Sequence, residues 1–230
     1  MAVRRTPRFY FSLRSPYSWL AYRDLQERYP TLATTLDWVP FWEPDELSGR
    51  LLAEAGGEFV YTPMSRAKHL YVLSDVRRLA ADRGLEFTWP VDREPCWEIP
   101  HLAYLVACRH GVGPEYLALA YRARWQEGRN ICERATVARI GDALGLDADE
   151  LASAADDPEV RREGVEALLA IYRDGVFGVP FFVHGFEKFW GIDRLPAFAA
   201  AVPVPEHADA GPLLVGGPGR TDEGHAGGCG

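Results

Sequence analysis

Hydrophobic and polar residues alternate only near the two ends of this 230-residue chain. The stretch RFYFSL (residues 8–13) places Phe9 and Phe11 on one face, and the run VFGVPFFVHGFEKFWG begins at Val176. Such alternation is typical of strands with at least one buried face. Between about Glu43 and Arg173 it is almost absent, and helical patterns replace it. We therefore expect a strand-containing unit that is interrupted by a long helical segment.

Proline before and glycine after an apolar run mark most of the helices predicted in this middle segment. The predicted helices run from Thr62-Pro63 to Gly84, from Pro100 to Gly111, from Pro114 to Gly128, through CERATVARIGDALG, from Asp147 with Glu150 as a capping box, and from Asp157-Pro158 to Gly175. This pattern repeats too often to arise by chance, so the segment is predicted to be all helical.

The two ends supply the strands. A helix from Pro16 to about Tyr29, followed by the strand TLDWVPFW, makes a strand–helix–strand unit with two parallel strands. A hairpin that turns at His184-Gly185 and a closing helix, DRLPAFAAA, end the folded part. Without the helical block, the order βαβ–ββα is that of a minimal thioredoxin fold.

The fold class predicted is α/β, a thioredoxin-like fold interrupted by an all-α helical insertion domain. We expect the thioredoxin-like domain to be split between residues 1–43 and 175–203, and the helical domain to cover 44–174. Residues 204–230 are rich in glycine and proline, so a disordered tail is predicted.

Charge and composition exclude several classes of protein. A net charge of −8 argues against a nucleic-acid binder. The first residues, MAVRRTPRFYFSL, lack the apolar core of a signal peptide, and no apolar run is long enough to span a bilayer. No two of the four cysteines form Cys-x-x-Cys, and none has zinc-ligand spacing, so no metal site is predicted. We expect a cytoplasmic protein with reduced thiols.

Three short motifs could carry chemistry, although each also has a purely structural explanation. Ser15-Pro16 suits the start of a helix, where serine caps free N–H groups and proline takes the first position. Val179-Pro180 at the start of a buried strand could be an edge-strand proline or a cis bond that exposes the preceding backbone to a ligand. Asp193 precedes the closing helix and is expected to cap it.

Together, FYFSLRSPYSWLAY, GVFGVPFFV and FWGIDRLPAF resemble the 2-hydroxychromene-2-carboxylate isomerases and kappa-class glutathione transferases. These families belong to the branch of the DsbA-like thioredoxin superfamily that carries a helical insertion. YRARWQEGRNI is similar to a further stretch of that insertion. The resemblance spans about residues 8–200.

The resemblance implies a glutathione site. Ser15 matches the serine that contacts the glutathione sulfur, and is the catalytic residue implied. Val179 and Pro180 match the residues that bind the cysteinyl backbone beside a cis-proline. Lys68, Ile192 and Asp193 complete the implied ligand contacts, with Asp193 holding the γ-glutamyl ammonium. Relatives in this family are dimers, so a homodimer is implied as well.

Departures from the family pattern leave the identity of the thiol open. The segment after Trp42 contains no clear asparagine near the thiol ligand and adds Glu43 and Glu58. Ile192 stands where relatives carry a polar residue. Another small thiol, or a reaction without a thiol, would fit these changes.

Other polar and aromatic residues are weaker candidates. The aromatic candidates for a substrate pocket are Tyr17, Trp42, Tyr71 and Trp97. His69 and His101 lie on predicted helices and are expected to be structural or surface residues. Arg124 and Arg129 could bind a carboxylate, but a solvated helix face is the simpler expectation.

Three functions remain in competition. The leading hypothesis is a glutathione-dependent isomerase that acts on a double bond or hemiketal ring of an aromatic or conjugated, polyketide-like small molecule. The second is a kappa-like glutathione transferase, which would release the thiol adduct. The third is a non-catalytic thiol- or peptide-binding module. DsbA-type disulfide exchange is the least favoured, because both motif cysteines are serines, Ser15 and Ser18.

Overall fold

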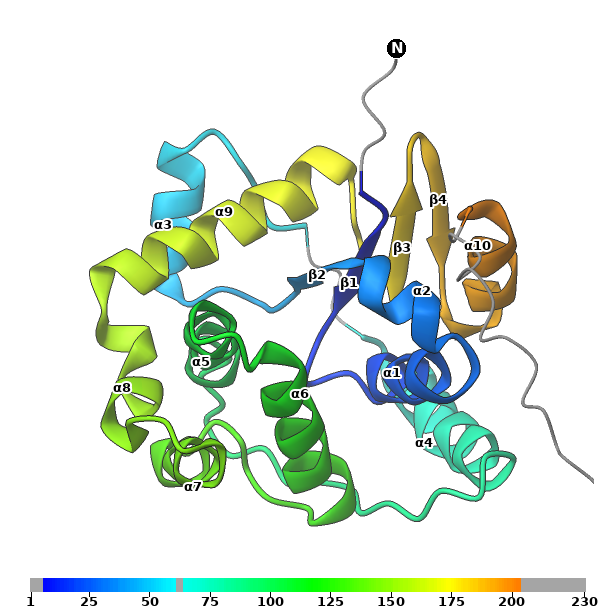
Figure 1. The fold of residues 1–230 in the computed structure, drawn as a ribbon, viewed down its shortest axis with the longest axis horizontal. Helices are drawn as coiled ribbons and strands as arrows, with labels where there is room; N and C mark the ends of the chain where they lie inside the picture. Colours follow the sequence, from blue (N-terminus) through cyan, green and yellow to red (C-terminus); the bar gives the residue numbers. More distant parts are fainter. Residues whose placement is uncertain (1–5, 61–63, 204–230) are drawn as a thin grey trace, which may run out of the picture.

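A four-stranded sheet lies at the centre of the protein, as the computed structural model, which describes residues 6–60 and 64–203, shows (Figure 1). Its strands are β1 (Arg8–Phe11), β2 (Asp37–Pro40), β3 (Phe181–His184) and β4 (Glu187–Trp190), in the order β2-β1-β3-β4. β1 is parallel to β2 and antiparallel to β3, and β3 and β4 form a hairpin. The predicted βαβ unit and hairpin are therefore confirmed. The predicted disordered tail, residues 204–230, lies outside the described residues.

Helices cover both faces of this sheet. On one face Phe9 stacks on Phe182 at 4.8 Å, and Phe182 stacks on Phe198 of α10 (Leu195–Ala201), also at 4.8 Å. The side chain of Tyr10 points to the other face, where its hydroxyl donates a 2.6 Å hydrogen bond to Asp174. Asp174 is the last residue of α9 (Pro158–Asp174), so α9 is attached directly to the central strand.

The segment between β2 and β3 is helical, as predicted. Its helices are α3 (Glu46–Glu54), α4 (Arg66–Ala81), α5 (Glu98–Arg109), α6 (Gly113–Tyr121), α7 (Arg134–Leu144), α8 (Ala148–Ala152) and α9. The sequence analysis missed α3, which has no proline at its start and contains Gly49. The cap of α3 is Asp45, whose carboxylate accepts from the Ser48 N–H. Whether these helices form an independent domain stays a prediction.

Several helices begin or end differently from the expectation. α4 is capped by Ser65 and begins at Arg66, and its predicted start, Thr62-Pro63, lies outside the described residues. Pro30 ends α1 (Pro16–Arg28), as predicted, but it also begins a short helix, α2 (Pro30–Thr35). α6 ends earlier than expected and continues as the π-helical turn η1 (Arg122–Gln126). α5 begins at Glu98, two residues before the proline that was taken as its start.

α1 and α4 lie side by side below the sheet in Figure 1. Near their C-terminal ends, the guanidinium of Arg83 donates two hydrogen bonds, of 2.9 and 2.7 Å, to the buried carboxylate of Asp24. Near the N-terminal end of α1, the Tyr17 hydroxyl donates to Asp75 of α4 at 2.7 Å. α4 is thus fastened to the helix that Ser15 begins.

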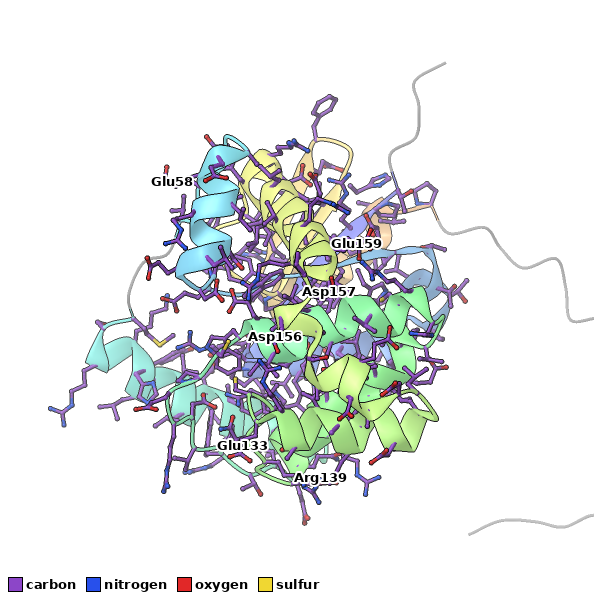
Figure 2. All side chains as sticks on the ribbon, turned by 90° about the vertical axis from the view of Figure 1, so that its left-hand side faces the viewer. Glu58, Glu133, Arg139, Asp156, Asp157 and Glu159 are labelled. Carbon is purple, nitrogen blue, oxygen red and sulfur yellow. The ribbon has the colours of Figure 1, made fainter. Side chains whose placement is uncertain are left out.

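Several acidic side chains gather on one face of the helical segment. Glu58, Asp156, Asp157 and Glu159 lie on one face, with Arg139 at its lower edge (Figure 2). Two of these acids have partners, Asp156 with Arg134 at 2.8 Å and Glu159 with Arg162 at 3.1 Å, so the face carries both signs of charge. Within residues 6–60 and 64–203, no helix is both long enough and apolar enough to cross a membrane.

Candidate active site

Ser15 occupies the turn between β1 and α1. Its Oγ accepts a 3.2 Å hydrogen bond from the Ser18 N–H, and its own N–H donates to the Ser12 carbonyl at 3.1 Å. The hydroxyl proton of Ser15 has no acceptor among the described residues. Because Ser15 is only half-buried, this proton can be donated to an anion at the helix N-terminus. The capping role and the predicted ligand role are therefore compatible.

A buried histidine holds this turn in place. His101 of α5 is 0% exposed, and its Nε2 accepts a 3.1 Å hydrogen bond from the Leu13 N–H. Its Nδ1 must then carry the proton, which it donates to the Trp97 carbonyl at 2.7 Å. Burial lowers the pKa of His101 to about 3, so the ring stays neutral. The expectation of a structural histidine is confirmed for His101.

Sequence analysis did not predict this contact, because 88 residues separate the Leu13 amide from the His101 ring. Trp42 stacks on the same ring at 5.4 Å and is 2% exposed. The Trp42 N–H donates to the Glu98 carboxylate at 3.2 Å. The structure therefore gives Trp42, a predicted pocket residue, a packing position behind the turn.

The second motif borders the same end of the sheet. β3 is antiparallel to β1, so Val179-Pro180, which precede β3, lie near the end of β1 from which the Ser15 turn begins. The Val179-Pro180 peptide bond is cis, as the resemblance implied. The backbone N–H and C=O of Val179 have no partner among the described residues. An extended ligand backbone could bind there.

Asp193 lies beside α1, in the short 3-10 turn η3 (Ile192–Arg194), which packs against that helix. The predicted capping role of Asp193 is wrong: α10 begins at Leu195, its cap position is Arg194, and no side chain caps it. The Asp193 carboxylate is exposed and lies 3.7 Å from the Arg194 guanidinium.

Asp193 and Ile192 line a cavity of about 160 Å³. Its other walls include Arg28 and Arg83, which lie at the C-terminal ends of α1 and α4. This cavity therefore extends away from Ser15 along α1.

Asp75 is hydrogen-bonded to two of the aromatic candidates, Tyr17 and Tyr71. Its carboxylate accepts from the Tyr17 hydroxyl at 2.7 Å, the Tyr71 hydroxyl at 3.2 Å and the Arg78 guanidinium at 2.9 Å. Partial burial alone would raise the pKa of Asp75, but these three donors lower it. Burial and the Asp75 charge raise the pKa of Tyr17. Lys68 is exposed one turn before Tyr71, so the predicted α4 residues share one face of that helix.

The guanidinium groups of two arginines lie over the ring of Trp97. The guanidinium of Arg124 lies 5.0 Å from the Trp97 ring centre and that of Arg14 lies 5.4 Å from it. Trp97 itself is only 4% exposed.

The expectation of a solvated face is wrong for Arg124, whose side chain is 3% exposed and makes a two-pronged ion pair with Asp92 at 2.7 and 2.9 Å. Arg129 does lie at the surface, where it pairs with Glu127 at 2.8 Å. The missed residue is Arg14, which sequence analysis did not single out although it precedes Ser15 directly.

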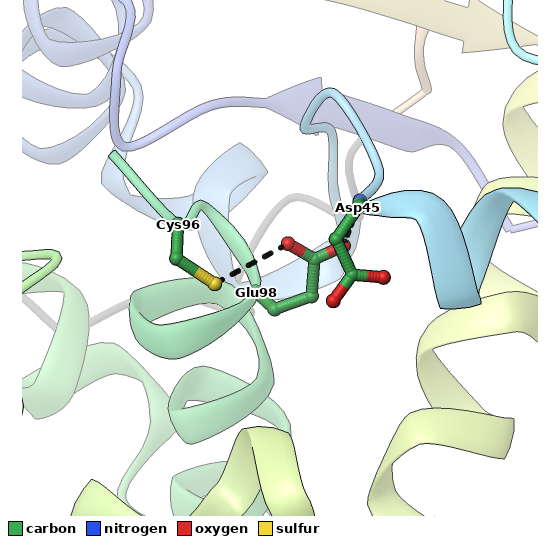
Figure 3. Close-up of side chains that lie close together, drawn as sticks. All are labelled: Asp45, Cys96 and Glu98. Atoms are coloured by element: carbon green, nitrogen blue, oxygen red, sulfur yellow. Dashed lines mark hydrogen bonds between the residues drawn. The ribbon is translucent and has the colours of Figure 1, made fainter. Parts of the chain in front are cut away.

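Asp45, Cys96 and Glu98 lie close enough together to resemble a metal site (Figure 3). Their donor atoms already have protein partners, since Arg161 pairs with Asp45 at 2.9 Å and Cys96 donates to Glu98 at 3.7 Å. Glu98 also accepts from the backbone N–H of Asp45 at 2.6 Å. Burial raises the pKa of the Cys96 thiol, which disfavours the thiolate that would bind metal. The cluster joins the loop after β2 to α5.

The three cysteines that the structure describes lie outside the Ser15 turn. Cys96, Cys108 and Cys132 are unpaired in the described part of the chain, and Cys229 is outside it. Positions 15 and 18 both carry hydroxyls, so the first turn of this helix supplies no sulfur of its own.

Comparisons with known proteins agree with this arrangement. A curated 2-hydroxychromene-2-carboxylate isomerase from Sphingobium xenophagum is 29% identical over 196 residues, which is 84% of this chain and 95% of that protein. A solved structure of a 2-hydroxychromene-2-carboxylate isomerase matches with a TM-score of 0.66 and 22% identity, over 85% of this chain and 93% of its own.

A probable DsbA oxidoreductase from Streptomyces coelicolor matches with a TM-score of 0.61 and 19% identity, over 93% of this chain and 99% of its own. The cytosolic disulfide reductase DsbM from Pseudomonas aeruginosa, solved with GSH, matches with a TM-score of 0.53 and 21% identity, over 85% of this chain and 93% of its own. These structures share the fold. The DSBA-like thioredoxin domain matches residues 8–203, and this chain belongs to that family.

Proposed function

We propose that this protein is an isomerase that uses the thiol of bound glutathione, or of a similar small thiol, as its nucleophile. The observation that carries the proposal is the Ser15 hydroxyl, which stands at the N-terminus of α1 with a proton free to donate. A thiolate held there would be stabilised by that proton, by the free N–H groups of the first helical turn and by the helix dipole.

The rest of the site suits a short peptide-like thiol. The unpaired backbone of Val179 would bind the cysteinyl part, and Asp193 would bind an ammonium group. Lys68 extends from α4 toward solvent and could meet a ligand carboxylate. Support for a thiol ligand also comes from the relative DsbM, whose structure was solved with GSH.

The proposed reaction is addition and elimination. The thiolate sulfur forms a bond to one carbon of a conjugated double bond, and the electron pair of that bond moves onto the substrate's conjugated acceptor group. The former double bond is then single and can rotate; in a cyclic hemiketal substrate the ring C–O bond first breaks to give a ketone and a phenol, and the hemiketal hydroxyl proton passes to the phenol oxygen. The electron pair returns, the carbon–sulfur bond breaks, and the thiolate leaves unchanged. A conjugated aromatic substrate is proposed because of the relative named 2-hydroxychromene-2-carboxylate isomerase.

The relatives reported above favour neither a glutathione transferase nor a non-catalytic binding module. The mass of the product separates the possibilities. Isomerisation leaves it unchanged and consumes no thiol, transfer adds the mass of the thiol, and a binding module gives no product. We also propose that the protein is cytoplasmic and that it forms a homodimer. Light scattering on the purified protein would test the dimer.

The direct test is turnover of 2-hydroxychromene-2-carboxylate with and without glutathione. We expect glutathione to be required, and Ser15→Ala to lower kcat/KM by about tenfold to a hundredfold. Asp147→Ala is the matched control, because it removes a helix cap of similar strength from α8, which lies far from α1 in Figure 1. Full activity without a thiol, or in Ser15→Ala, would sink the proposal.

A further inference from the structure

Arg14 lies directly before Ser15 and is held in a defined position. Its backbone N–H donates to the Ser12 Oγ at 3.3 Å, within the turn that His101 anchors. Its guanidinium lies over the Trp97 ring, 5.4 Å from the ring centre. The side chain is nevertheless 45% exposed. The protein therefore presents a positioned but accessible cation next to Ser15.

The ion pair of Arg14 is weak. Its Nη1 lies 3.3 Å from one oxygen of Glu43, whose side chain is 48% exposed. Arg124, over the same tryptophan, is instead held by two short contacts to Asp92 and is buried. Exposed single pairs contribute little, about 0–1 kcal/mol. A guanidinium has five N–H donors, so Arg14 keeps donors that a ligand can use.

The order of the strands places Arg14 opposite the proposed thiol contacts. β1 lies between β2 and β3, and Val179-Pro180 precede β3. Glu43 follows β2 on the other side, where the Phe41 N–H pairs with the Phe11 carbonyl at 2.6 Å. Arg14 extends to this β2 side, since it contacts Glu43 and Trp97. A thiol bound on the β3 side would leave the exposed guanidinium of Arg14 free for a second molecule.

We propose that Arg14 binds the carboxylate of a flat, conjugated substrate on the β2 side of Ser15, and that Glu43 is an internal counter-ion which the substrate displaces. The inference rests on the proposed function and adds to it the substrate's charge and its side of entry. The planar guanidinium fork matches a carboxylate through two parallel hydrogen bonds. The other acids near this point, Asp45, Asp92 and Glu98, already have partners of their own.

The test compares the binding of cinnamate with that of cinnamamide, its neutral analogue of the same shape, by calorimetry without any turnover. We expect the wild type to bind cinnamate about tenfold more tightly than cinnamamide. Arg14→Gln should abolish this preference while leaving cinnamamide binding unchanged. Glu43→Gln should strengthen cinnamate binding a few-fold, because the competing carboxylate is gone.

Arg50→Gln is the matched control, since Arg50 is also an exposed arginine with a single ion pair, to Glu46 at 2.8 Å. It should keep the wild-type preference. Equal binding of the two probes by the wild type, no binding of either probe, or a preference that survives in Arg14→Gln would each overturn the inference. This experiment measures binding and not turnover. It can therefore fail while the protein proves to be an isomerase, and it can succeed while isomerase activity is absent.

Discussion

The turn before α1 and the first half of α4 both contribute candidate residues to the site, but the protein holds them in different ways. The turn is fixed by buried hydrogen bonds, from Leu13 to His101 and from the Ser12 N–H to the Ser18 hydroxyl at 3.2 Å. α4 exposes Leu70 and Tyr71 by more than half, and the Tyr17–Asp75 contact attaches its midpoint to α1. The thiol end is thus preorganised by buried contacts, whereas the first half of α4 has no buried side chain, and Val76 and Ala80 in its second half carry the packing.

This difference suggests that the turn activates the thiol and that α4 accommodates the substrate. A rigid turn suits the activation of one thiol, because the donors must stay aligned on the sulfur. The exposed first half of α4 suits the accommodation of differing substrates, because few buried contacts have to change with it. If this is so, substitutions in the turn should cost mainly stability and rate, and substitutions on α4 should cost mainly substrate affinity.

The largest effect is expected at the base of the turn. His101→Ala removes a buried ring and leaves the Leu13 N–H without an acceptor, so it should destabilise the protein by about 3 kcal/mol. Urea unfolding measures this loss. The control His69→Ala, on the exposed part of α4, should change stability by less than about 0.5 kcal/mol. Similar losses in the two variants would remove the contrast between turn and α4.

The next effect is a loss of stability in mild acid. The unfolded His101 binds a proton below its ordinary pKa of 6.5, whereas the folded one does so only near its lowered pKa of about 3. Between these values the unfolded state holds more protons, so stability falls as pH falls, by up to about 1.4 kcal/mol per pH unit. From pH 7 to pH 5 the contribution of His101 should fall by about 2 kcal/mol.

Unfolding curves of wild type and His101→Gln at both pH values isolate this contribution. The glutamine oxygen can still accept from Leu13 but does not titrate. We expect the pH dependence to be shallower in His101→Gln. Parallel pH profiles would mean that His101 is not neutral in the fold.

A smaller effect is expected where α4 meets α1. Tyr17→Phe removes the 2.7 Å hydrogen bond to Asp75 and should cost about 1 kcal/mol of stability. If the first half of α4 adjusts to the substrate, KM should rise a few-fold while kcat stays nearly constant. Tyr22→Phe on the same helix is the control, because the Tyr22 hydroxyl has no hydrogen-bond partner in the described part of the chain. A fall in kcat alone would place Tyr17 with the turn instead.

The smallest effect on folding is expected at Lys68. Its exposed side chain makes no ion pair among the described residues, so Lys68→Ala should change stability by less than about 0.5 kcal/mol. If Lys68 meets a ligand carboxylate, the Kd for glutathione should rise by about twofold to fivefold, and less so at high salt. Arg66→Ala, two residues earlier on α4, should leave the Kd unchanged. Equal Kd values for Lys68→Ala and wild type would remove Lys68 from the site.

Local signals in the sequence were enough to predict most elements of the fold. Proline at the starts of α1 and α9 and glycine after α9 set boundaries that the structure confirms. α3 was missed because it is short and lacks such a start. The capping role of Asp193 was wrong because a 3-10 turn intervenes before α10, and residue patterns do not distinguish the two.

The site was less predictable, because the contacts that position its residues join segments that are far apart in the sequence. The motifs around Ser15 and Val179 could be read directly, as both belong to short conformational signals. The contacts of His101 with Leu13 and of Arg14 with Glu43 and Trp97 depend on tertiary packing. The buried ion pair between Arg124 and Asp92 also depends on tertiary packing. For that reason Arg124 was predicted, wrongly, to lie on a solvated helix face.

The central claim is that Ser15 and the start of α1 activate a thiol that belongs to a ligand. The ultraviolet absorbance of the glutathione thiolate, titrated with pH in the presence of saturating protein, measures this directly. We predict that binding lowers the thiol pKa from about 8.5 by at least about one unit, and that Ser15→Ala returns it most of the way while Asp147→Ala does not. A thiol pKa that is the same free and bound, or the same in wild type and Ser15→Ala, would contradict the account.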